Sequence, residues 1–179
     1  LWDEVLTRES VANIIQHFVR FDGAENDALS KKNLFFPRYH QLDVVRRLIK
    51  DTTQKGAGDT YLIQHSAGSG KSNSITWLAY QLIEAYPESE AVAGSKNTNQ
   101  PLFDSVIVVT DRRLLDKQLR DNIKEFSEVK NIVAPAYRSS DLKSALENGK
   151  RIIITTIQKF PFIIEGIADM SNKQFAVIV

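Results

Sequence analysis

The sequence contains no cysteine, which excludes disulfide bonds and thiolate metal ligands. It also lacks any apolar run near the ~20 residues that a membrane-spanning helix needs, and its start has no basic-then-apolar signal pattern. An excess of charge is missing too, because 23 lysines and arginines are balanced by 22 aspartates and glutamates. Any contact with nucleic acid must therefore come from a local basic surface and not from the net charge of +1.

What the sequence does contain is an ordinary globular composition with a strong alternating pattern. At 179 residues, 42% of them hydrophobic, it is long enough for one domain with a buried core. Beyond residue 60, continuous apolar runs alternate with stretches whose apolar residues recur at helical spacing. Such runs indicate a parallel sheet with helices on both faces, because right-handed crossovers place helices on the sheet. The predicted fold class is therefore α/β with three layers.

The positions of the predicted elements follow from this pattern. The strands are expected at 60–64, 105–110, 131–134, 151–155 and 175–179, and the helices between them at 71–86, 113–126 and 140–148. Before them, residues 10–20 have helical periodicity, and Pro37 opens a second helix. The polar stretch 22–33 between these two helices indicates a linker.

One short segment carries the strongest functional signal. Residues 64–74 read QHSAGSGKSNS and connect a predicted strand to a predicted helix. Residues 65–72 have the spacing of the phosphate-binding loop G-x-x-x-x-G-K-[ST], except that His65 stands at the first glycine. Glycines at positions 68 and 70 would let backbone N–H groups approach a phosphate closely. We therefore predict a triphosphate-binding loop in which His65 is a spacer.

The loop residues have distinct expected roles. Lys71 is the predicted catalytic residue, with its ammonium on the β- and γ-phosphates, and without phosphate it is expected to point into solvent. Ser72 is expected to bind Mg²⁺ through its hydroxyl. The predicted nucleotide-binding residues here are Gly68, Ser69, Gly70, Lys71 and Ser72. The alternative is a plain turn into a helix with a solvated lysine, but the strand before it and the helix after it favour phosphate binding.

A second motif lies about thirty residues before the loop lysine. Residues 36–41, FPRYHQ, contain a P-x-x-x-Q spacing that is similar to the adenine-recognition motif of superfamily 2 helicases. In that motif a glutamine amide satisfies both a donor and an acceptor on adenine. The resemblance implies that Gln41 and Arg38 bind nucleotide and that ATP is preferred over GTP. The alternative is a glutamine that faces water at a helix start.

Two further segments indicate contacts with a nucleic-acid backbone. Residues 109–119, VTDRRLLDKQL, and residues 155–160, TTIQKF, each begin at the end of a predicted strand. Basic and hydroxyl side chains there could hold phosphates without reading the base sequence. The predicted DNA-binding residues are Arg112, Arg113, Thr155, Thr156 and Lys159. Ordinary surface arginines and helix-capping threonines are the alternatives.

Taken in order, these motifs resemble the motor part of the R (restriction) subunit of type I restriction-modification enzymes. The resemblance implies a RecA-like motor domain over residues 36–179, which stops before the family's acidic metal-binding pair. It also implies that residues 1–35 are a helical segment joining the motor to a nuclease domain. The full-length protein would be an ATP-driven translocase and a type I deoxyribonuclease. The present residues alone would bind nucleotide without turnover.

The resemblance also implies cofactors and partners. ATP and Mg²⁺ are the expected cofactors. Double-stranded DNA and the modification and specificity subunits are the expected partners, in a bacterial or archaeal cytoplasm and without membrane contact. Two other functions stay open: a superfamily 2 helicase or translocase without a nuclease, and a nucleotide-binding module that is not a motor. Nucleotide and DNA affinities are coupled reciprocally in a motor, whereas the module would bind nucleotide independently of DNA.

Overall fold

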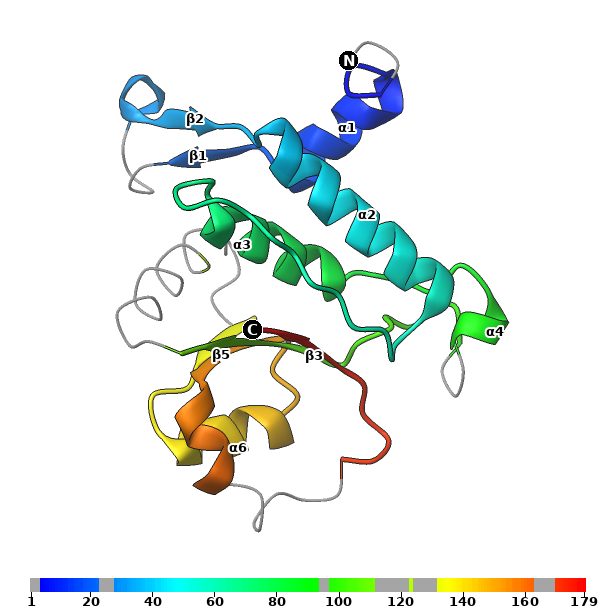
Figure 1. The fold of residues 1–179 in the computed structure, drawn as a ribbon, viewed down its shortest axis with the longest axis vertical. Helices are drawn as coiled ribbons and strands as arrows, with labels where there is room; N and C mark the ends of the chain where they lie inside the picture. The colour runs from blue at the N-terminus through cyan, green and yellow to red at the C-terminus, as the bar shows by residue number, and fades with distance from the viewer. Residues whose placement is uncertain (1–3, 23–27, 94–96, 112–122, 124–131, 163–169) are drawn as a thin grey trace.

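A parallel sheet of four strands forms the centre of the structure, a computed structural model (Figure 1). The structure describes residues 4–22, 28–93, 97–111, 123, 132–162 and 170–179. The strands are β3 (Ser105–Thr110), β4 (Val133–Pro135), β5 (Ile152–Thr156) and β6 (Phe175–Ile178). Their order in the sheet is β4-β5-β3-β6, and all three neighbouring pairs are parallel. The carboxyl ends of all four strands therefore lie at the same end of the sheet.

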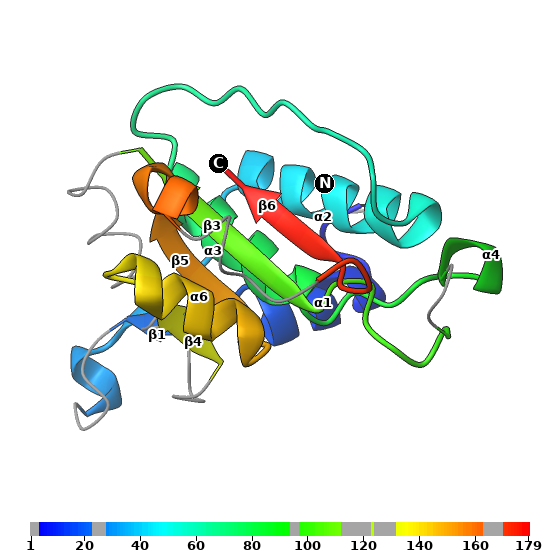
Figure 2. The ribbon, with the colours of Figure 1, turned by 90° about the horizontal axis from the view of Figure 1, so that it is seen from below.

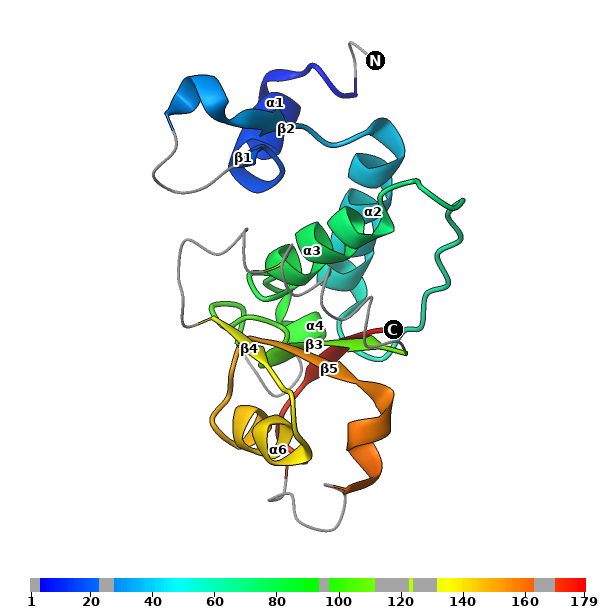
Figure 3. The ribbon, with the colours of Figure 1, turned by 90° about the vertical axis from the view of Figure 1, so that its left-hand side faces the viewer.

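Helices cover both faces of this sheet. The helix α3 (Lys71–Leu82) lies on one face and α6 (Ser139–Glu147) on the other (Figures 1 and 3). The long helix α2 (Tyr39–Lys55) packs against α3, and α1 (Arg8–His17) lies at the end of the molecule far from α6. The predicted α/β class with three layers is confirmed. None of the described helices is both long and apolar enough to cross a bilayer.

The smaller elements complete the described chain. An antiparallel pair joins β1 (Arg20–Asp22) to β2 (Asn33–Phe35), and the short helices are η1 (Leu29–Lys31), α4 (Glu90–Ala93) and η2 (Ile157–Phe162). The stretch 22–33, predicted as a linker, thus contains η1 in its described part. Figure 2 shows β6 at one edge of the sheet and α6 in front of the strands.

Most predicted elements are confirmed. The strands expected at 105–110, 131–134, 151–155 and 175–179 are β3 to β6, and the helices expected at 10–20, 71–86 and 140–148 are α1, α3 and α6, with ends that differ by a few residues. The helix expected at 113–126 lies almost wholly outside the described residues. Along β3, Val106 and Val108 face the core under α3, whereas Ile107 and Val109 face the core under α6. Burial on both faces explains the continuous apolar runs.

Trp77 of α3 packs against the segment that follows the amino-terminal helix α1. Its side chain is 0% exposed, and its indole N–H donates a hydrogen bond of 3.0 Å to the carbonyl oxygen of Phe18. The rings of Phe18 and Phe35 lie 5.6 and 6.0 Å from the Trp77 ring, measured between centroids. The segment that follows α1 therefore shares one core with the α/β part of the chain.

Replacement of Trp77 by alanine should destabilise the fold strongly. The change removes a fully buried aromatic side chain and leaves a cavity, which typically costs about 3–5 kcal/mol of unfolding free energy. Guanidinium unfolding followed by circular dichroism measures this loss. The matched control is Phe162→Ala, because Phe162 is 79% exposed and its loss should change stability by less than about 0.5 kcal/mol. Equal effects of the two changes would contradict the assigned core.

Arg46 fastens α2 to α1. Its guanidinium donates hydrogen bonds to Oδ1 of Asn13 at 3.0 Å, to Oγ of Ser10 at 2.9 Å and to the carbonyl oxygen of Ser10 at 3.0 Å. Such a planar group with several fixed donors orients two helices more firmly than one flexible ammonium could. The position of the first turn of α2 therefore depends on α1.

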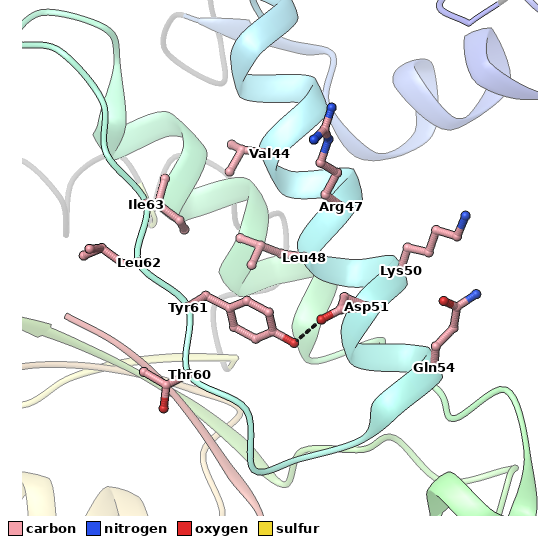
Figure 4. Close-up of a pocket in the computed structure, with 10 residues that line it drawn as sticks. All are labelled: Val44, Arg47, Leu48, Lys50, Asp51, Gln54, Thr60, Tyr61, Leu62 and Ile63. Atoms are coloured by element: carbon pink, nitrogen blue, oxygen red, sulfur yellow. Dashed lines mark hydrogen bonds between the residues drawn. The ribbon is translucent and has the colours of Figure 1, made fainter.

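The strand expected at 60–64 is wrong in this structure. Residues 60–63 are extended but pair with no strand, and they run past α2 as a separate segment (Figure 4). Leu62 is 97% exposed and points away from α2. Apolar composition predicts an extended backbone, whereas a strand also needs a neighbour with free N–H and C=O groups. The local sequence does not supply that second condition.

A hydrogen bond from Tyr61 joins the extended segment to α2. The hydroxyl of Tyr61 donates a 2.6 Å hydrogen bond to Oδ2 of Asp51, which also accepts one of 2.9 Å from the ammonium of Lys55 (Figure 4). A groove of about 620 Å³ lies between the segment and α2, with Leu48 and Ile63 among its apolar lining residues.

Asp51 should have a pKa below the ordinary value of an aspartate. The hydrogen bond from Lys55, followed by that from Tyr61, lowers the pKa of its carboxyl below the ordinary value. Because the folded-state pKa is the lower one, the stabilisation is present above the unfolded pKa of about 3.9 and is lost as pH falls through the folded pKa. Carboxyl ¹³C NMR measures the titration. Lys55→Met should raise the pKa of Asp51 more than Tyr61→Phe does. A wild-type pKa at or above the ordinary value would show that these hydrogen bonds are not formed in solution.

Candidate nucleotide-binding site

The predicted phosphate loop is a turn that leads directly into α3. Gly68 and Gly70 have φ angles of 72° and 81°, a left-handed backbone that L side chains rarely adopt. A Cβ atom at Gly68 would meet nothing within 4 Å, so only its backbone requires glycine. A Cβ atom at Gly70 would also collide with Nε2 of Gln41. Gly70 is therefore favoured by its conformation, and a side chain there would also have to displace the amide of Gln41 from the loop carbonyls.

The amino end of α3 is open to an anion. Gly70 is its N-cap residue, no side chain caps the helix, and its first turn contains no acidic residue. The first N–H groups of a helix lack intrahelical partners and carry its positive dipole end. Beside them, Ser69 is 8% exposed, and within the described part of the chain its Oγ has no hydrogen-bond partner. A glycine turn, free helix N–H groups and a buried hydroxyl suit a phosphate.

Lys71 lies across this turn. Its ammonium donates hydrogen bonds to the carbonyl oxygens of His65 at 3.1 Å and Ser66 at 2.8 Å, although the residue is exposed. The expectation that this side chain points freely into solvent is therefore wrong, because the loop offers it two acceptors. A phosphate group is a stronger partner for an ammonium than neutral carbonyls are. The ammonium is thus already placed at the loop that a phosphate would enter.

Gln41 contacts the loop from the first turn of α2. Its amide is buried, with 3% of the residue exposed, and Nε2 donates to the carbonyl oxygens of Ser69 and Gly70, each at 3.1 Å. Its Oε1 accepts the backbone N–H of Arg38 at 2.9 Å. Both N–H groups of the amide are used, so reading both edges of adenine would require it to release a loop carbonyl. The adenine roles of Gln41 and of the exposed Arg38 stay predictions.

His40 is a contact that the sequence patterns did not reveal. Its Nε2 lies 3.0 Å from the carbonyl oxygen of Ser69. A carbonyl can only accept, so this nitrogen carries the hydrogen and donates it. The ring of His65 packs edge-on against that of His40, with 5.2 Å between the centroids. The only signal was the position of His40 next to Gln41 at a helix start, and tertiary structure was needed to interpret it.

Of the predicted DNA-binding residues, three lie at or just after the carboxyl end of β5, whereas Arg112 and Arg113 lie outside the described residues. Thr155 and Thr156 end β5 and are 0% and 5% exposed, while Lys159 lies in η2 and is partly exposed. Thr155 therefore has no surface available to DNA in this conformation.

Two hydrogen bonds join these strand ends. The hydroxyl of Thr110 donates to the carbonyl oxygen of Thr155 at 3.4 Å, and the amide of Gln158 donates to the carbonyl oxygen of Asp111 at 3.3 Å. The first residue after β3 is thereby tied to the start of η2. The carboxyl ends of β3 and β5 are consequently held together at one end of the sheet.

The fold and this loop define a known class of protein. Residues 40–179 match the model of the SWI2/SNF2 ATPase family, and the chain belongs to that family. More particularly, the chain is 30% identical over 170 residues to the Type I restriction enzyme HindI endonuclease subunit of Haemophilus influenzae. The predicted resemblance to the R subunit of type I enzymes is confirmed. The matched region covers 89% of the chain and 14% of that relative's length.

Replacement of Lys71 by alanine should abolish most nucleotide binding and leave the fold intact. The side chain is exposed, and its partners in the structure are loop carbonyls that water can satisfy. Loss of a charged hydrogen bond to phosphate should weaken ATP binding by about 10- to 100-fold. Titration with a fluorescent ATP analogue measures the affinity, with Lys143→Ala on α6 as the control. A variant that unfolds would instead identify Lys71 as a structural residue.

Proposed function

We propose that this chain is the nucleotide-binding part of an ATP-driven motor on double-stranded DNA. The observation that carries the proposal is the uncapped start of α3 behind a left-handed Gly70, with the ammonium of Lys71 across the turn. Membership of an ATPase family supports the assignment to ATP. Gly68, Ser69 and Gly70 would surround the phosphates, and Lys71 would neutralise charge that develops at the γ-phosphate.

The divalent metal would be held jointly by the chain and the nucleotide. No group of three or more His, Asp or Glu side chains among the described residues could hold a metal ion. Ser72, in the first turn of α3, is the residue of the loop that offers a hydroxyl oxygen for Mg²⁺. When bound, the ion would supply charge neutralisation between the β- and γ-phosphates.

DNA is proposed to bind at the carboxyl ends of the strands. Ligands of open parallel sheets commonly bind there, and the start of α3 lies at the same end of the sheet as the ends of β3 and β5 (Figure 1). We propose Arg112, Arg113, Thr156 and Lys159 as contacts to phosphates of one strand. Thr156 is 5% exposed and Thr155 is fully buried, so these two hydroxyls would reach a phosphate only after a local rearrangement.

For the full-length protein we propose the function of the restriction subunit of a type I restriction enzyme. The similarity to a type I restriction endonuclease subunit favours this function, and with it a deoxyribonuclease domain joined through residues 1–35 and modification and specificity subunits as partners in the cytoplasm. The ATPase family match alone fits a second candidate equally well, a translocase without a nuclease.

A motor predicts that the two ligands are coupled. The affinity of the 179-residue chain for a short DNA duplex should change when a non-hydrolysable ATP analogue and Mg²⁺ are added, typically by about 5- to 150-fold. The affinity for the analogue should change by the same factor when DNA is added. Fluorescence anisotropy at one fixed salt concentration measures both, because phosphate contacts depend on salt.

Lys71→Ala is the control for this coupling. It should retain DNA binding in the absence of nucleotide and lose the response to the analogue. Nucleotide binding that is indifferent to DNA in the unmodified chain would contradict the motor and support a nucleotide-binding module.

A further inference from the structure

The first turn of α2 donates hydrogen bonds to two peptide groups of the phosphate loop. The carbonyl oxygen of Ser69 accepts two hydrogen bonds, from Nε2 of His40 at 3.0 Å and from Nε2 of Gln41 at 3.1 Å. The carbonyl oxygen of Gly70 accepts one from Gln41, also at 3.1 Å, in addition to those from the backbone N–H groups of Asn73 and Ser74 in α3. A carbonyl oxygen has two lone pairs, so the Ser69 oxygen is saturated. The Ser69 carbonyl is therefore held by α2, and the Gly70 carbonyl by α2 together with the first turn of α3.

Holding a carbonyl also aims the N–H of the same peptide group. No described peptide bond is cis, and in a planar trans peptide the N–H points opposite to the C=O. The Ser69 carbonyl belongs to the same peptide group as the Gly70 N–H, and the Gly70 carbonyl to that of the Lys71 N–H. Both N–H groups consequently point away from α2, where they can donate to an anion.

We propose that His40 is a positioning residue of the phosphate loop. It acts through the Ser69 carbonyl on the direction of the Gly70 N–H and does not contact the nucleotide itself. The inference rests on the proposed phosphate binding by this loop. A Ser69 carbonyl released from α2 could turn toward the ligand, where its negative end would repel phosphate. The loop would then have the phosphate-binding conformation in only a fraction of the molecules. The apparent affinity for phosphate would be reduced in proportion to that fraction.

The role of Gln41 does not make His40 redundant. The Gln41 amide divides its two N–H groups between the carbonyls of Ser69 and Gly70, so it holds each with one hydrogen bond. His40 supplies the second bond at Ser69, which is the carbonyl that aims the N-cap N–H of α3. The edge-on ring of His65 limits how the His40 ring can turn. His40 therefore contacts the loop at two points, the ring of His65 and the carbonyl oxygen of Ser69.

Two conservative variants separate the hydrogen bond from the ring. His40→Phe keeps an aromatic ring beside His65 but has no donor. His40→Gln removes the ring and can place an N–H at the position of Nε2. Because His40 is exposed, both variants should fold, which circular dichroism and unfolding by guanidinium check.

The probes are inorganic tripolyphosphate and ATP, each with Mg²⁺, titrated calorimetrically into the 179-residue chain. For His40→Phe we expect both affinities to fall by the same factor, about fivefold for one hydrogen bond. For His40→Gln we expect both to return to within about twofold of the unmodified chain. Without ligand, the ¹⁵N–¹H resonance of Gly70 should shift or broaden in His40→Phe and return in His40→Gln.

Each other result overturns the proposal in a recognisable way. Weaker binding of ATP with unchanged binding of tripolyphosphate would make His40 a base contact. A His40→Gln variant that folds but stays weak would assign the effect to ring packing against His65. Unchanged affinities in His40→Phe would show that the hydrogen bond is not needed. Failure of the unmodified chain to bind either probe would instead contradict the proposed function of the loop.

Discussion

The geometry of the site depends on hydrogen bonds between the first turn of α2 and the carbonyl oxygens of Ser69 and Gly70. They join residues that lie 28 or 29 positions apart in the sequence. Because they hold the carbonyls on one side, the N–H groups of Gly70 and Lys71 point to the other side. A side chain at Gly70 would displace the Gln41 amide, because Nε2 of Gln41 occupies the space of a Cβ atom. The position of α2 depends in turn on Arg46, so packing of the amino-terminal helix extends to the phosphate loop.

The elements that were predicted correctly are those whose signal is local. The strands β3 and β5 are buried on both faces, and a continuous apolar run in the sequence predicts such burial. The turn at Gly68 to Ser72 has left-handed glycines at 68 and 70, and the helix predicted after it is α3, whereas its binding of phosphate stays a prediction. The extended run at 60–63 has the same composition as a strand but no pairing partner in the structure. Composition cannot distinguish these two cases.

The contacts that were missed depend on tertiary structure. A histidine that donates to a carbonyl 29 residues away produces no periodicity and no motif, so His40 had no recognisable role in the sequence. The ammonium of Lys71 was expected in solvent because the two carbonyls that accept its hydrogen bonds become neighbours only once the turn forms. Thr155 was assigned to DNA from its place at a strand end, and only the packed sheet shows that it is fully buried.

A crystal structure of the chain with a non-hydrolysable ATP analogue and Mg²⁺ tests the central claim most directly. The account predicts phosphates at the start of α3, within hydrogen-bond distance of the N–H groups of Gly70 and Lys71. It also predicts that the ammonium of Lys71 leaves the carbonyls of His65 and Ser66 for a phosphate oxygen, while His40 keeps its hydrogen bond to the carbonyl oxygen of Ser69. An analogue bound elsewhere, or a loop whose N–H groups point away from it, would contradict the account.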